Sequence, residues 1–194
     1  PPKGYLPGVR KICDEFGILM ICDEVQCGMG RTGAMFAWQA YDIKPDIMSM
    51  AKAIGSGIPV GAFAMTEEVA KYSLEPGDHG TTYGGNPLAC TAVSKTIEIF
   101  EKKHLVEHVQ KVGAYLTKKL EELVEEYDTV KAVKGKGLMQ GIQVTKPISE
   151  ITGAALKEGL LIIGAGSDVI RFVPPLIIEL EQVDEMIRIL KKAL

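Results

Sequence analysis

Two charged residues stand where apolar runs end, and their types suit covalent chemistry on a bound molecule. Asp23 follows the run ILMIC, and Lys52 follows the run DIMSMA. Ligands of open α/β sheets bind beyond the carboxyl ends of parallel strands, so neighbouring strands would bring both side chains to one crevice. The apolar run before Lys52 and the small residues after it indicate that little of this lysine is exposed. A lysine amine shielded from water is more readily neutral, and the neutral amine is a nucleophile that forms Schiff bases.

Pyridoxal phosphate enzymes need this pair of groups. They use a lysine that reacts with the cofactor's aldehyde, and an anion that keeps the pyridine nitrogen protonated so that the ring withdraws electrons. Asp23 would supply the anion. Two other interpretations remain open at this point: Asp23 and Lys52 form a structural ion pair, or either is an ordinary surface residue at a strand end.

A glycine-rich segment, HGTTYGGNP, is predicted to be a loop because it combines several glycines with a proline. The hydroxyls of Thr81 and Thr82 and the backbone N–H groups of this loop would hold a phosphate. A helix is predicted to begin just after Pro87, which favours the same ligand. The alternative is an ordinary surface loop.

Arg171 lies in DVIRFVPPL, between apolar residues of a predicted strand. A guanidinium there needs an anionic partner, and a substrate carboxylate matches its fork of donors. The alternative is an arginine on the outward face of an alternating strand. His104 and His108 are four residues apart on a predicted helix, but no third metal ligand accompanies them, so we expect no metal site.

The segment GMGRTG, residues 28–33, fits the glycine pattern of dinucleotide-binding loops. A dinucleotide-dependent oxidoreductase is therefore the alternative from another enzyme class. Two features argue against it. The residues DEVQC separate the apolar run from the first glycine, and Asp46, near the spacing expected of a ribose-binding acid, begins a strand instead of ending one. We interpret the segment as a flexible turn beyond residues 23–26.

The hydrophobic pattern predicts an α/β first part and an α+β second part. A helix over residues 7–16 ends at Gly17, buried parallel strands follow over ILMIC and DIMSMA, and a further strand covers VGAFAM. Apolar residues three or four apart then predict a long amphipathic helix. They are Leu105, Val109, Val112, Leu116, Leu120 and Leu123. Short strands separated by glycine and proline turns come next, and an amphipathic helix with lysines in its last turn closes the chain.

The composition is that of a globular protein, with 194 residues of which 46% are hydrophobic and 24% charged. A net charge of −3 gives no electrostatic case for a nucleic-acid partner. No apolar run approaches the roughly 20 residues of a membrane span. The four cysteines form no C-x-x-C pair, which is typical of a reducing cytoplasm. The chain opens on PPKGYLPGVRK without an initiator methionine, which indicates the middle of a protein.

Three ordered motifs resemble the class III aminotransferases, and within that class the acetylornithine aminotransferases: LMICDEVQCGMGRTGAMFAWQ, PDIMSMAKAIGSGIPVGA and HGTTYGGNPLAC. DVIRFVPPL is similar to a strand of the family's small domain. The resemblance covers essentially the whole chain. It implies the aspartate aminotransferase fold, fold type I. Residues 1–100 would be the carboxyl-terminal part of the large domain that binds pyridoxal 5'-phosphate, with a partial sheet, and residues 101–194 a small α+β domain.

The resemblance also implies roles at the sheet edge. Lys52 would hold the cofactor covalently as a Schiff base and later carry the proton between the substrate Cα and the cofactor C4′. Asp23 would pair with the pyridine nitrogen. Gln26, in the motif DEVQ, would lie near the cofactor's phenolic oxygen.

Further roles follow from the same resemblance. Thr82 would bind the cofactor phosphate across a homodimer interface, and Thr81 would lie near the substrate entrance. Arg171 would hold the substrate α-carboxylate. The reaction implied is a ping-pong transfer of an amino group from N-acetylornithine to 2-oxoglutarate. Ornithine, 4-aminobutyrate and succinylornithine remain alternative amino donors.

Members of the family are about twice as long as this chain, so we expect it to be the carboxyl-terminal part of a longer enzyme. The other half would carry a second phosphate-binding loop and the aromatic residue stacked on the cofactor. We therefore expect weak cofactor binding and little or no transaminase activity from the chain alone. Exposed apolar strands and strand edges predict self-association. A non-catalytic interaction module that kept the fold is the remaining alternative.

Overall fold

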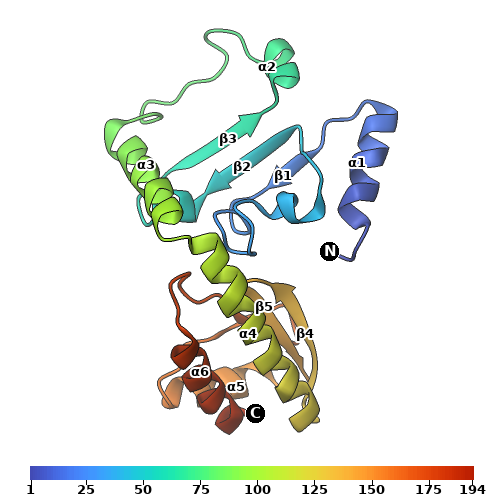
Figure 1. Cartoon of the computed structure of the whole chain (residues 1–194), viewed down its shortest axis with the longest axis vertical. Helices are drawn as coiled ribbons and strands as arrows, with labels where there is room; N and C mark the ends of the chain where they lie inside the picture. Colours follow the sequence, from blue (N-terminus) through green and yellow to red (C-terminus); the bar gives the residue numbers. More distant parts are fainter. The chain divides into compact units, whose positions relative to one another are not determined.

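A computed structural model describes residues 1–194 and divides the chain into two compact units. The first unit comprises Pro1–Gly30 and Ala34–His104, and the second comprises Arg31–Gly33 and Leu105–Leu194. Figure 1 labels their helices and strands. None of the helices combines the length and the apolar character that a membrane crossing requires.

A three-stranded sheet of order β1-β2-β3 is the centre of the first unit. β1 (Ile21–Asp23) and β2 (Ile47–Ala51) run parallel, whereas β3 (Gly61–Met65) is antiparallel to β2. The three predicted strands and the parallel pairing of the first two are confirmed, but β2 is only half-buried and not buried as predicted. The register sets Asp23 directly opposite Ser49, so their side chains lie on one face of the sheet.

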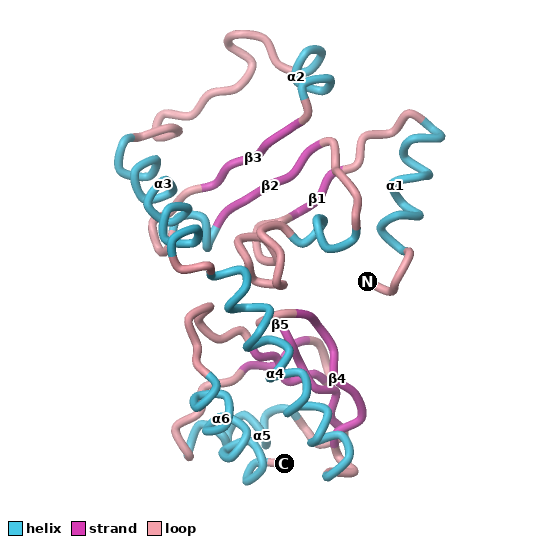
Figure 2. Tube along the Cα trace, in the orientation of Figure 1, coloured by secondary structure: helices cyan, strands magenta, loops and turns pink.

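Helices and one long loop complete the first unit. α1 ends at Gly17, as predicted, because its φ of 63° is the left-handed conformation of a helix cap. The loop over residues 74–86, drawn in pink in Figure 2, joins α2 to α3 where the sequence predicts a loop. The helical segments are α1 (Tyr5–Phe16), η1 (Ala37–Tyr41), η2 (Lys52–Gly55), α2 (Glu67–Ser73) and α3 (Pro87–Lys102).

The prediction that ILMIC is a buried strand is wrong. Only the last two residues of the run and Asp23 form β1, and Ile18, Leu19 and Ile21 are each more than half exposed. β1 is an edge strand, since only β2 pairs with it. A continuous apolar run is buried throughout only where neighbours cover both faces of its strand.

The second unit contains an antiparallel sheet of order β4-β5-β7-β6. The strands are β4 (Val130–Lys136), β5 (Met139–Val144), β6 (Ile163–Ala165) and β7 (Val169–Phe172). These are the short strands that the sequence predicts.

Three helices build the core of the second unit: α4 (Leu105–Glu126), α5 (Ile148–Lys157) and α6 (Leu180–Ala193). The six apolar residues predicted for the inner stripe of α4 are all at most 7% exposed, which confirms the amphipathic helix. The closing helix is confirmed too. The lysines in its last turn, Lys191 and Lys192, pair with Glu126 and Glu158.

The prediction that His104 and His108 share a helix is wrong. His104 has a φ of +49° and lies between the end of α3 and the start of α4. A left-handed residue interrupts the helical path, so the two imidazoles are not on adjacent turns. His108 lies on α4, with its Nε2 2.9 Å from the carbonyl oxygen of Ile178. No three histidine, cysteine or acidic side chains of the chain are grouped as a metal site.

The segment GMGRTG is a turn, as predicted, and hydrogen bonds of its residues hold it in place. Within the second unit, Arg31 donates Nη1 to the carbonyls of Leu138 and Pro174, at 3.1 and 2.5 Å, and its own carbonyl accepts from Leu138 N at 2.9 Å. The carbonyl of Gly33 accepts from Gln110 Nε2 at 2.7 Å. No α-helix follows these glycines, so the helix N-terminus that a dinucleotide loop needs is absent.

Candidate functional site

The structure brings Asp23 and Lys52 to the same edge of the first unit's sheet. Asp23 is the last residue of β1, and Lys52 comes directly after β2. Because the two strands are parallel, their carboxyl ends meet at one edge. Asp23 is opposite Ser49 of β2, and Lys52 comes three residues after Ser49, directly beyond the end of that strand. Both charged side chains are exposed, so both are accessible to a ligand.

The backbone of Lys52 is in an uncommon conformation. Its φ is +51°, in the left-handed region, and it begins the short helix η2. A lysine there costs of order 1 kcal/mol, and such residues concentrate at functional sites. The predicted burial of Lys52 is wrong, because the residue is exposed at the end of β2. No ion pair joins Lys52 to Asp23, so the interpretation as a structural pair is wrong too.

One oxygen of the Asp23 carboxylate is held by two donors. Oδ1 accepts from the backbone N–H of Val25 at 2.9 Å and from the Ser49 hydroxyl at 3.3 Å. The first contact is an Asx turn, in which an aspartate binds the N–H two residues on. Oδ2 has no partner within the chain. Gln26 follows in the same turn, with an exposed side chain.

Glu24 is the residue of this turn that sequence reasoning missed. Its side chain is 3% exposed, and its carboxylate accepts from Ala37 N at 2.9 Å and from Trp38 N at 3.0 Å. The Sγ of Cys27 lies 3.2 Å from the same carboxylate. Burial and this contact raise the pKa of Cys27 to about 12. The only signal in the sequence is a second acid after an apolar run, directly following Asp23.

The predicted phosphate-binding residues lie in the exposed loop between α2 and α3. Thr81 and Thr82 are both exposed, and Gly84 N donates to the Thr81 carbonyl at 3.2 Å. Asn86 caps α3 by accepting from Ala89 N at 3.0 Å, and the predicted start of this helix at Pro87 is confirmed. No hydrogen bond connects either threonine to the Asp23–Lys52 edge.

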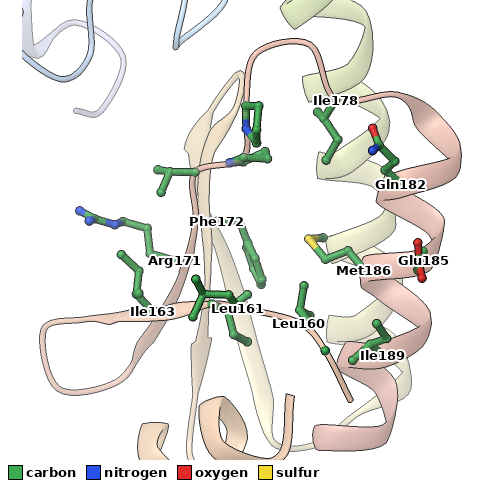
Figure 3. Close-up of a pocket in the computed structure, with 15 residues that line it drawn as sticks. Leu160, Leu161, Ile163, Arg171, Phe172, Ile178, Gln182, Glu185, Met186 and Ile189 are labelled. Atoms are coloured by element: carbon green, nitrogen blue, oxygen red, sulfur yellow. The ribbon is translucent and has the colours of Figure 1, made fainter. Parts of the chain in front are cut away.

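Arg171 belongs to the second unit. It lies on β7, opposite Gly141 of β5 and Ile163 of β6. Its neighbours Ile170 and Phe172 point into the core, so Arg171 points to the other face of the sheet, as Figure 3 shows. The residue is half-buried, and its Nε is buried without a hydrogen-bond partner. This leaves a buried donor available to an anion.

A cavity of about 490 Å³ adjoins the same strand, between β6, β7 and α6. Its walls are mostly apolar, with Phe172 and Met186 on opposite sides in Figure 3. Arg171 is one of the lining residues, and Figure 3 shows its guanidinium pointing away from Phe172 and Met186.

Comparison with known proteins identifies the family. The family model described as aminotransferase class-III matches residues 1–194. The acetylornithine aminotransferase of Methanocaldococcus jannaschii is 47% identical over 188 residues, which are 97% of this chain and 47% of that protein. The corresponding enzyme of Clostridium acetobutylicum is 44% identical over 193 residues, 99% of this chain and 50% of that protein. The chain thus spans about half the length of the curated relatives it matches.

Solved structures agree with this result. Ornithine δ-aminotransferase of Plasmodium falciparum superposes with a TM-score of 0.93 at 34% identity, covering 100% of this chain and 50% of that one. Acetylornithine aminotransferase of Elizabethkingia anophelis gives a TM-score of 0.92 at 31% identity, covering 100% and 49%. These are fold type I enzymes that depend on pyridoxal phosphate, so the predicted fold class is confirmed. The chain belongs to the class III aminotransferases.

Proposed function

We propose that this chain is the carboxyl-terminal part of a pyridoxal phosphate-dependent enzyme that transfers an amino group from N-acetylornithine to 2-oxoglutarate. The observation that carries the proposal is the arrangement of Lys52 and Asp23 where two neighbouring parallel strands end. The substrate is supported by the acetylornithine aminotransferases that are 41–47% identical to the chain.

The residues at this edge fit the cofactor chemically. Lys52 has an exposed amine that no carboxylate of the chain occupies, and Asp23 has an unpaired carboxylate oxygen. An amine that reacts with an aldehyde and an acceptor for a ring N–H are the two groups that this cofactor needs. The left-handed backbone of Lys52 is the kind of strain that functional sites retain.

Each residue then has a defined task. When bound, pyridoxal phosphate supplies a ring that stabilises negative charge developing at the substrate Cα. Lys52 would hold the cofactor through its amine, and the same amine, when free, would act as the base that takes the proton from the substrate Cα and carries it to the cofactor C4′. Asp23 would keep a proton on the pyridine nitrogen. Gln26 would donate a hydrogen bond to the phenolic oxygen.

The remaining candidates bind the ends of the ligands. Thr82 binds the cofactor phosphate of the partner subunit in a homodimer, and Thr81 lies at the substrate entrance; the exposure of both supports an intermolecular role. Arg171 binds the substrate α-carboxylate, supported by its unpaired, buried Nε. Residues 1–100 serve as part of the cofactor-binding large domain and residues 101–194 as the small domain of a cytoplasmic enzyme.

Ornithine is the second candidate substrate. The structure that favours it is the ornithine δ-aminotransferase of Plasmodium falciparum, which is 34% identical to the chain. Paired measurements with N-acetylornithine and ornithine as amino donors on an enzyme that contains this chain would decide between them. We expect the higher kcat/KM with N-acetylornithine, and a preference for ornithine would contradict the substrate assignment.

Covalent trapping tests the role of Lys52. The chain is incubated with pyridoxal phosphate, reduced with borohydride and mapped by mass spectrometry of its peptides. We expect one phosphopyridoxyl label, on the peptide that contains Lys52. Lys52→Ala should lose the label, and Lys44→Ala, which removes another exposed lysine of the same unit, should retain it. Label spread over many lysines and unchanged in Lys52→Ala would contradict the proposal.

The isolated chain is expected to have little or no transaminase activity. It spans about half the length of its relatives, so it carries only part of the machinery for binding cofactor and substrate. Turnover of N-acetylornithine with 2-oxoglutarate by the purified chain would overturn this expectation. Its exposed apolar β1 edge also favours self-association, and a clean monomer in sizing chromatography would argue against that.

A further inference from the structure

Ser49 is the only polar residue in β2, whose sequence is IMSMA. The parallel register sets it directly opposite Asp23, and β3 sets Phe63 opposite its other side. The side chains of directly opposed residues lie on the same face of a sheet. The single hydroxyl of this strand therefore stands beside the one carboxylate at the end of β1.

The hydroxyl of Ser49 and the N–H of Val25 converge on one oxygen of Asp23. They donate to Oδ1 from two separate segments, at 3.3 and 2.9 Å. Val25 belongs to the same turn as Asp23 and moves with it, whereas Ser49 belongs to the neighbouring strand. The contact to Ser49 is long for a hydrogen bond. The two donors together restrict the rotation of the Asp23 carboxylate.

With Oδ1 occupied, Oδ2 is the only oxygen of Asp23 that has no partner within the chain. Asp23 is exposed, so an aspartate without these contacts would rotate among its rotamers. An acceptor that is already oriented does not lose rotamer freedom when its ligand binds, which raises affinity.

We infer that Ser49 is a positioning residue, which holds Asp23 so that Oδ2 faces the pyridine nitrogen of the cofactor. This inference rests on the proposed function and adds to it a residue that touches neither cofactor nor substrate. The hydroxyl contributes by orienting the acceptor and not by binding the ring.

The test uses the 194-residue chain and three variants. Ser49→Ala removes the hydroxyl, Ser49→Thr keeps it, and Ser94→Ala removes an exposed serine on α3 as a matched control. Equilibrium dialysis measures the affinity for pyridoxal phosphate and for its 1-deaza analogue, in which a carbon replaces the ring nitrogen. Three-bond NMR couplings of Asp23 measure its χ1 rotamer without cofactor.

We expect Ser49→Ala to bind pyridoxal phosphate roughly three- to tenfold more weakly, the effect of one hydrogen bond of this kind. Its affinity for the deaza analogue should stay within a factor of about two of the wild-type affinity. That analogue has no ring N–H from which Asp23 could accept a hydrogen bond. Ser49→Thr and Ser94→Ala should bind both compounds like the wild type. The Asp23 couplings should report one rotamer in the wild type and averaging only in Ser49→Ala.

Equal losses for both compounds in Ser49→Ala would mean that the hydroxyl only supports the fold, which overturns the inference. Unchanged Asp23 couplings in Ser49→Ala would overturn it as well, whether or not the chain binds the cofactor. If the wild-type chain, which spans about half the length of its relatives, binds both compounds too weakly to measure, the Asp23 couplings decide the inference by themselves. The Lys52 labelling experiment tests the proposed cofactor site separately.

Discussion

Replacing Glu24 by glutamine is the sharpest test of how the DEVQ turn is held. The Glu24 carboxylate is 3% exposed, and it accepts two backbone N–H groups, from Ala37 at 2.9 Å and from Trp38 at 3.0 Å. These contacts fasten the start of η1 to the end of β1. Glutamine has nearly the same shape, so it changes the hydrogen bonds without opening a cavity.

The magnitude follows from the donors that lose their partner. A hydrogen bond to a charged group contributes about 1.5–3 kcal/mol, and a buried donor left unpaired costs about 1–3 kcal/mol. The amide of glutamine keeps one acceptor oxygen and turns an NH2 group toward the second donor. Removal of the buried charge offsets part of the loss. We expect Glu24→Gln to lower the free energy of unfolding by about 2–3 kcal/mol, or Tm by about 4–12 °C.

Trp38 provides the assay, because it is the only tryptophan of the chain and its backbone N–H is one of the two donors to Glu24. Its fluorescence during urea unfolding reports the stability of the first unit. Glu15→Gln is the control, since Glu15 is exposed on α1, and its effect should stay within about 0.5 kcal/mol. Equal effects of the two variants would refute the reasoning.

A double-mutant cycle isolates the contact itself. Ala37→Pro removes one donor at the first position of η1, where proline is compatible with a helical start and the preceding Phe36 is extended. We expect Ala37→Pro to destabilise the wild type but to be nearly neutral in Glu24→Gln, a coupling of at least about 1 kcal/mol. Additive effects would mean that Glu24 does not hold η1 through this N–H.

Three further predictions concern other parts of the chain. Burial alone would raise the pKa of Asp46, but hydrogen bonds from the Met20 N–H and Arg10 outweigh it and lower that pKa below its ordinary 3.8. The stabilisation is thus present above about pH 4 and lost as pH falls through the lowered value. Between pH 5 and 2 the unfolding free energy of the wild type should therefore fall more steeply than that of Asp46→Asn, and parallel pH profiles would contradict this. The pKa of Cys27 is raised to about 12, so its thiol should react more slowly than the exposed thiol of Cys90. At pH 8 iodoacetamide should alkylate Cys90 at least about tenfold faster than Cys27, as measured by peptide mapping. Equal rates for the two cysteines would contradict the raised pKa of Cys27. Gly137→Ala should destabilise the second unit, because φ of Gly137 is +59° and the new Cβ would lie 2.6 Å from the carbonyl carbon of Thr32. We expect the free energy of unfolding, measured by hydrogen exchange of β5, to fall by at least about 2 kcal/mol. A fall of less than about 0.5 kcal/mol would contradict this prediction.

Periodic elements could be predicted from the sequence because their signal is local. The apolar stripe of α4 repeats every three or four residues, and every residue of it is buried. The sheet edge was predictable for a similar reason. Asp23 and Lys52 each end an apolar run, and two parallel strands always finish at the same edge.

Burial of single residues could not be predicted, because it depends on neighbours that are distant in the sequence. Ile21 lies in an apolar run yet is 64% exposed, since β1 has one neighbouring strand. Glu24 is an acid yet is buried, since two N–H groups 13 and 14 residues further on reach its carboxylate. A pattern of residue types does not contain either fact. The contact of Ser49 with Asp23 likewise requires the register of two strands.

The segment GMGRTG shows why glycine patterns need structural context. Arg31, Thr32 and Gly33 of this segment belong to the second unit, where Arg31 donates to the carbonyls of Leu138 and Pro174. Gly137 completes this contact, since any side chain on it would collide with Arg31 and Thr32. A guanidinium satisfied by two carbonyls has no need of an anionic ligand, and burial lowers its pKa without a counter-ion to restore it. The same short pattern that resembles a cofactor loop thus carries an arginine that binds the turn between β4 and β5.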